Sequence, residues 1–181
     1  MKRFTKLLFL FTLIGVLSGG CELLKNSVKF NEDYSVTFTI NPSGDDLTQW
    51  FIEQNVQTNI QSILDDNNVS ADKLRSATLI EVRAELESGS AESNFDKIID
   101  GEIHLQYGSE APFKAAWWNT STPAGSTVSY LDYNSTDLKG MLLTDSFNAG
   151  GWITLNAPTL GVSYVTVYFV FELDGKILGK V

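Results

Sequence analysis

Apolar and polar residues alternate along much of this chain, which is the pattern of β-strands that bury one face. In residues 34–41, written YSVTFTIN, every second residue is apolar. Residues 162–173, written VSYVTVYFVFEL, have one apolar face and a second face that is only half polar. Such a strand lies in the middle of a covered sheet, or it presents Tyr164 and Tyr168 to a partner.

Further strands are predicted between these two. Residues 78–86 place Ile80 and Val82 on the inward face. The spacing of Leu79, Val82 and Leu86 also fits a helix, and we favour the strand. Four other alternating or apolar segments are strand candidates: 101–107, 113–118, 126–133 and 151–156.

Short helices and one tight turn are expected between the strands. Apolar residues at helical spacing, or residues suited to an N-cap, predict helices within three segments: 55–66, 93–100 and 134–143. In the last of these, Ser135 or Thr136 is the expected cap. The dipeptide Asp174-Gly175 predicts a hairpin turn before a short final strand.

Seven or eight strands in one domain predict a mainly β fold, a single antiparallel β-sandwich with a few short helices in the crossovers. The chain has 181 residues, of which 19% are charged and 12% aromatic, a composition that favours a folded, sheet-rich body. We expect the sandwich domain to cover residues 33–181.

The N-terminal residues have the anatomy of an export signal. Basic residues precede an apolar run at 7–17, which is too short to span a bilayer, since that takes about 20 residues. The residues Leu17, Ser18, Gly19 and Gly20 then lead directly into Cys21. This resembles a bacterial lipobox, although the leucine lies one position earlier than is usual. The resemblance implies a lipoprotein signal peptide at 1–20, lipidation of Cys21, and a short tether at 21–32.

Cys21 has few other chemical uses in this sequence. A metal site or a catalytic cysteine would need His or Cys partners, and the chain has one histidine, His104, and no second cysteine. An intermolecular disulfide would leave the basic start and the small residues unexplained. Removal of residues 1–20 would move the formal charge from −9 to −12, which disfavours nucleic acid as a partner.

Candidate reacting groups are sparse. His104 alternates outward from a predicted strand between Glu102 and Gln106, and no serine lies in a G-x-S-x-G motif. With 22 acidic residues, a carboxylate-based hydrolase stays open, but abundance alone does not support one. We predict no enzyme activity and no cofactor.

Acidic and amide residues also raise the question of calcium. Asp65, Asp66 and Asn68 lie in a segment that offers oxygen ligands. An EF-hand alignment fails there, because Ala71 and Ala77 occupy the positions of the glycine and the bidentate glutamate. A structural calcium site is a weak alternative to turn and cap roles for these residues.

Aromatic residues are the best candidates for ligand contact. Trp117 and Trp118 are adjacent on a predicted strand, so their side chains must point to opposite faces. Other tryptophans occur at Trp50 and Trp152. We single out four aromatic residues, with Asn119 beside them, as a possible ligand site: Trp117, Trp118, Tyr130 and Tyr133.

The overall layout is similar to that of small cell-envelope lipoproteins of the Bacteroidota. The likeness rests on the order of SADKLRSATLIEVRAEL, FDKIIDGEIHLQY, TDLKGMLLTDSF and an alternating last strand behind the lipobox. It implies a lipid-anchored protein of the bacterial outer membrane, facing the periplasm or the cell surface. It implies no functional residues, since many such proteins have no assigned activity.

Two functions follow as hypotheses. The first is a non-catalytic binding or accessory protein, with an outer-membrane protein as partner. The second is a membrane-tethered carbohydrate-binding module that uses exposed Trp and Tyr side chains on a glycan. The second requires at least one indole of Trp117 or Trp118 to be well exposed beside a shallow groove.

Overall fold

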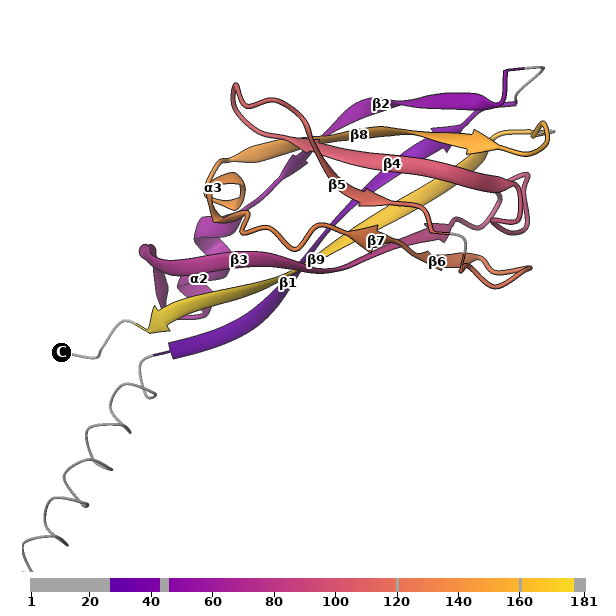
Figure 1. The fold of residues 1–181 in the computed structure, drawn as a ribbon. Coiled ribbons are helices and arrows are strands. Elements are labelled where there is room, and N and C mark those ends of the chain that lie inside the picture. The colour runs from indigo at the N-terminus through magenta and orange to yellow at the C-terminus, as the bar shows by residue number, and fades with distance from the viewer. Residues whose placement is uncertain (1–26, 43–45, 120, 160, 178–181) are drawn as a thin grey trace, which may run out of the picture.

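Two antiparallel sheets pack face to face in the computed structural model shown in Figure 1. The structure describes residues 27–42, 46–119, 121–159 and 161–177. One sheet has four strands, in the spatial order β1 (Ser27–Ile40), β9 (Ser163–Ile177), β3 (Val69–Leu86) and β6 (Val128–Tyr130). The other has five, in the order β2 (Thr48–Gln57), β8 (Ser146–Leu155), β4 (Ile98–Gln106), β5 (Phe113–Trp117) and β7 (Asp132–Tyr133).

Two short helices complete the fold. Helix α2 (Ile60–Asp66) follows β2, and helix α3 (Lys139–Leu142) precedes β8. Both lie at the same end of the long strands in Figure 1. In the described part of the chain, no helix is long and apolar enough to cross a membrane.

The core lies between the sheets and is rich in phenylalanine. The inward residues of β1 are buried, as their alternation predicts. Phe38 of β1 stacks on Phe51 of β2 with ring centroids 4.6 Å apart, so one aromatic pair joins the two sheets. Phe147 and Phe171 make edge contacts with Tyr34, whose hydroxyl donates to the carbonyl oxygen of Thr58.

The sandwich is joined along one side. Strands β6 and β7 are separated by Leu131 alone, yet they belong to different sheets. The Leu131 amide donates to the carbonyl oxygen of Val82 in one sheet, and the Asn134 amide donates to that of Ala115 in the other. This segment links the sheets, whereas β1 and β2 are the edge strands at the other side.

The predicted fold class is confirmed: the protein is mainly β, with two antiparallel sheets packed as a sandwich and two short helices. The strand preferred over a helix at 78–86 is also confirmed, as part of β3. Within it, Ile80 is on the surface and not in the core, because the register shifts between Leu79 and Glu81. A bulge of this kind moves later side chains to the other face, which alternation alone does not reveal.

Several boundaries differ from the sequence prediction. The prediction of a hairpin turn at Asp174-Gly175 was wrong. Strand β9 continues to Ile177, and its two neighbours, β1 and β3, both pair with Gly175. No helix forms over 93–100, where turns lead into β4. Strand β1 begins at Ser27, so residues 27–32 of the expected tether belong to the sheet.

The two helices that form are shorter than predicted. Residues 55–57 of the expected first helix belong to β2, a strand that we did not predict, and α2 begins only at Ile60. In the second, the residue before α3 is Leu138, not Ser135 or Thr136. The predicted signal peptide and Cys21 lie outside the described residues.

Candidate functional site

A row of residues crosses the outer face of the five-stranded sheet in register. Trp50 of β2 pairs with Trp152 of β8, and Trp152 pairs with Glu102 of β4. Glu102 in turn pairs with Trp117 of β5, and Trp117 with Asp132 of β7. Residues that pair directly across strands share a face of the sheet. We call these five residues the tryptophan row.

The row faces solvent because its neighbours along the strands face the core. Ile103 and Ile153, which flank Glu102 and Trp152, are fully buried. Trp50 is 74% exposed and lies beside Trp152, with ring centroids 6.5 Å apart and planes tilted by 52°. Trp152 and Trp117 are half-buried. The most exposed indole of the tryptophan row is therefore that of Trp50, at one end, and the other two indoles are more deeply set in the surface.

Charged side chains hold the middle of the row in place. Glu102 accepts a hydrogen bond from His104 Nε2 at 2.9 Å and another from Lys114 Nζ at 3.1 Å. Lys114 also lies over the Trp117 ring, 5.1 Å from its centroid. The hydrogen bond from His104 is the largest influence on the Glu102 carboxyl and lowers its pKa. Burial acts in the opposite direction, but the hydrogen bond and charge of Lys114 add to the effect of His104, so the pKa lies below its ordinary value.

A hollow of about 150 Å³ lies beside Trp50 on the same face. Its lining comes from the three adjacent strands β2, β8 and β4 and from the residues that follow β4. The residues that line it include Trp50, Glu53, His104, Gln106, Asn148 and Gly150. Glycine at position 150 leaves room on β8 for the Glu53 side chain, whose Cγ is 3.0 Å from where a Cβ would stand.

Hydrogen-bond acceptors and a hydrogen-bond donor are free among the described residues that line this hollow. The Glu53 carboxylate has no partner among the described residues. Gln106 uses its amide nitrogen on the carbonyl oxygen of Glu110, and Asn148 uses its amide oxygen on Asn55. Gln106 therefore keeps an acceptor oxygen and Asn148 keeps a donor NH₂ for a ligand.

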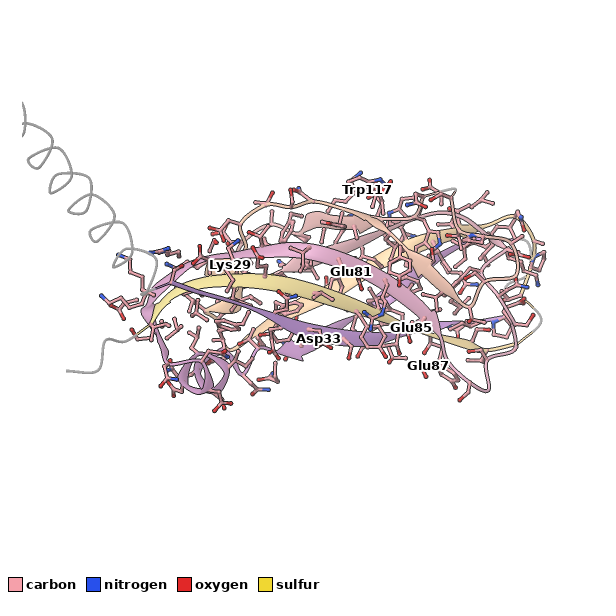
Figure 2. The ribbon with its side chains drawn as sticks, turned by 90° about the horizontal axis from the view of Figure 1, so that it is seen from below. Lys29, Asp33, Glu81, Glu85, Glu87 and Trp117 are labelled. Atoms are coloured by element: carbon pink, nitrogen blue, oxygen red, sulfur yellow. The ribbon has the colours of Figure 1, made fainter. Side chains whose placement is uncertain are left out.

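The four aromatic residues singled out from the sequence do not come together. Trp117 is in the tryptophan row, and Figure 2 shows it at the rim of the molecule, away from Glu81 and Glu85 on the four-stranded sheet. Trp118 is only 7% exposed and packs on Phe95, with ring centroids 5.7 Å apart. Its Nε1 is buried and has no hydrogen-bond partner in the described part of the chain. Because Trp117 is half-buried, neither of these two indoles has the exposure that the carbohydrate hypothesis required, and the well-exposed indole on this sheet is Trp50 instead.

The two tyrosines lie elsewhere. Tyr130 of β6 is 61% exposed and pairs with Arg83, so it belongs to the four-stranded sheet. Tyr133 lies on the edge strand β7 opposite Ala116. Asn119 donates to the carbonyl oxygen of Tyr130 and to Asp132, and so links the chain around β6 and β7. Its position is close to one end of the tryptophan row.

Trp50 and Trp152 are not among the four aromatic residues that the sequence indicates as a ligand site. Trp152 precedes a buried isoleucine in an alternating strand, which indicates an outward side chain. Trp50 lies in β2, which we did not predict as a strand, so its face was not assigned. Nothing local in the sequence indicates that Trp50 pairs with Trp152.

Of the residues considered for calcium, Asp65 and Asp66 end helix α2, and Asn68 lies in the turn that follows it. Asp65 accepts a hydrogen bond from Gln61, and the Asp65 carbonyl oxygen accepts one from the Asn68 amide. Asn68 has a positive φ of 56°, a conformation that asparagine tolerates well. Within the described ranges, no group of three or more His, Cys, Asp or Glu side chains is arranged to hold a metal ion.

Comparison with known proteins gives no family. No protein-family model and no curated protein matches the chain. The structure is similar to one of Desmodium yellow mottle tymovirus, at 14% identity and a TM-score of 0.28 over 84% of this chain and 91% of that one. It is also similar to a 60-mer BFDV capsid protein, at 10% identity and a TM-score of 0.39 over 86% and 97%. Similarity at these scores adds nothing to the sandwich described above.

Proposed function

We propose that this chain is a lipid-anchored, non-catalytic binding protein of the bacterial outer membrane, and that it binds neutral glycans through the tryptophan row. The observation that carries the proposal is the alignment of Trp50, Trp152 and Trp117 on one open sheet face. Sugar rings have apolar faces that stack on indoles, and a row of indoles suits a chain of such rings.

The charge around the row favours a neutral ligand. Glu53, Glu102 and Asp132 carry negative charge, and Lys114 is the neighbouring cation bound to Glu102. The whole chain has a formal charge of −9. An anionic ligand such as a nucleic acid would be repelled, whereas an uncharged polyol would not.

A protein partner is the second candidate, and a separate observation favours it. Trp50 is 74% exposed and Ile52 82% exposed on β2, an edge strand of the sheet. Exposed tryptophans and edge strands are common in protein interfaces. The free polar groups beside Trp50 favour the glycan, because a hot spot at a protein interface is usually surrounded by groups that exclude water.

Binding of the full-length protein in detergent to neutral polysaccharides tests the proposal. The double variant Trp50→Ala, Trp117→Ala should lose at least about tenfold in affinity, since it removes much of the stacking surface. Tyr130→Ala is the matched control, because Tyr130 is a similarly exposed aromatic residue on the other sheet.

Three results would separate the candidates. Loss of polysaccharide binding in the double variant but not in Tyr130→Ala supports the glycan. Equal binding by wild type and double variant contradicts the role of the row. Absence of glycan binding, together with a membrane protein that co-purifies with wild type and is lost from the double variant, supports the protein partner instead.

A further inference from the structure

The hollow beside Trp50 differs from the rest of the tryptophan row in what it offers a ligand. Trp117 offers a ring that Lys114 already covers in part, whereas Trp50 adjoins a recess with free polar groups. A ligand on Trp117 would make mainly stacking contacts. A ligand in the hollow would stack and form hydrogen bonds at the same time.

The free groups match sugar hydroxyls. Each hydroxyl both donates and accepts a hydrogen bond, and it therefore needs acceptors and donors within reach of one ring. The hollow has acceptors at Glu53 and at the amide oxygen of Gln106, and a donor at the amide nitrogen of Asn148. Phosphate would need cations, and an aliphatic ligand would leave these polar groups unpaired.

The hollow is not isolated from the row. His104 lines it and also holds Glu102, which lies between Trp152 and Trp117. Trp50 and Trp117 are on strands three positions apart in the sheet, roughly 14 Å at the usual strand spacing. That separation exceeds the length of one sugar ring, so a single sugar cannot contact both.

We infer that the hollow is a sugar subsite that selects the ligand through Glu53, Gln106 and Asn148, and that the tryptophan row is an extension that binds further sugars of the same chain. The inference rests on the proposed glycan binding and names its ligand class: a neutral, extended oligosaccharide that lies across the strands. The hollow supplies selectivity, and Trp117 supplies affinity that depends on ligand length.

The test measures affinities of the full-length protein in detergent for neutral β-linked glucose and mannose oligosaccharides, from disaccharide to hexasaccharide. Asn148→Asp keeps the oxygen that Asn55 uses and removes the donor into the hollow. We expect it to weaken binding of every length by about fivefold, the value of one hydrogen bond. Trp117→Ala should leave the disaccharide unchanged and weaken the hexasaccharide about tenfold.

Tyr130→Ala on the other sheet and Glu110→Gln, outside the hollow, are the controls, and both should bind every probe as wild type does. If Trp117→Ala weakens the hexasaccharide while Asn148→Asp changes nothing, the glycan function stands and the subsite is overturned. If Trp117→Ala weakens the disaccharide as much as the hexasaccharide, the assignment of Trp117 to the extension is overturned. If wild type binds none of these oligosaccharides, the inference fails.

Discussion

At the scale of single residues, the site depends on side chains that are already held in place. Glu102 lies between two indoles and is bound by His104 and Lys114 before any ligand arrives. A side chain held in this way loses little conformational entropy on binding. The Trp117 side chain is held by the same contacts, because Lys114 lies over its ring and is itself bound to Glu102.

Replacement of Glu102 should remove a pH-dependent contribution to the free energy of unfolding. The Glu102 carboxyl has a lowered pKa in the folded protein, so its hydrogen bonds with His104 and Lys114 stabilise the fold at pH values above the ordinary Glu range, and this contribution disappears as the pH falls through the lowered value. We expect Glu102→Gln to reduce the free energy of unfolding by less than about 1 kcal/mol at neutral pH, since the pairs are partly exposed.

Denaturant titrations at neutral and strongly acidic pH measure this effect. The difference between wild type and Glu102→Gln should shrink toward zero in acid. Glu110→Gln serves as the control, because the Glu110 carboxylate makes no ion pair in the described ranges. A difference that grows in acid would contradict the assignment.

At the scale of one element, strand β8 shows why two adjacent glycines have different roles. A Cβ at Gly151 would stand 2.1 Å from the carbonyl oxygen of Glu102, which is backbone and cannot move without separating β8 from β4. A Cβ at Gly150 would meet only the Glu53 side chain, at 3.0 Å. Gly151 is therefore required for the pairing of β8 with β4, whereas Gly150 leaves room for the Glu53 side chain on the outer face of the sheet.

Alanine substitutions at these two glycines give a matched pair. Gly151→Ala should lower the free energy of unfolding by at least about 3 kcal/mol, because the two strands must move apart. Gly150→Ala should change it by less than about 1 kcal/mol, since Glu53 can turn away. Thermal or denaturant unfolding followed by circular dichroism measures both, and equal stability of the two variants would contradict the steric account.

At the scale of the whole molecule, the sandwich presents two different outer faces. Figure 2 shows Asp33, Glu81 and Glu85 on the four-stranded sheet, where Arg83 pairs with both glutamates at 2.8 Å. The tryptophan row lies on the five-stranded sheet instead.

The proposed anchor makes a prediction about the whole molecule. Cys21→Ala should move the protein from the membrane fraction to the soluble fraction or leave an unprocessed precursor, because under this proposal the lipid attached at Cys21 supplies the membrane affinity. Fractionation of cells and the mass of the mature protein measure this. The control is Trp50→Ala, which should stay in the membrane, and unchanged processing of Cys21→Ala would overturn the lipobox assignment.

Much of this architecture was predictable because strand patterns are local. The alternation in 34–41 and 162–173 correctly assigned the buried faces of β1 and β9. His104 was correctly assigned to an outward position for the same reason. Local patterns failed where pairing with distant strands decides the local structure. Gly175 follows an aspartate, as in a tight turn, but it lies within β9 between β1 and β3.

The sequence by itself determined the β class of the fold, the faces of its regular strands and the lipobox-like pattern at Cys21, since each depends on residues close together in the chain. Only the tertiary structure decided which strands are neighbours and in what register. That choice aligned Trp50, Trp152 and Trp117, sent Tyr130 to the other sheet and buried Trp118. The physical reason is that strand pairing joins residues far apart in the sequence, and its register is set by the packing of the whole core.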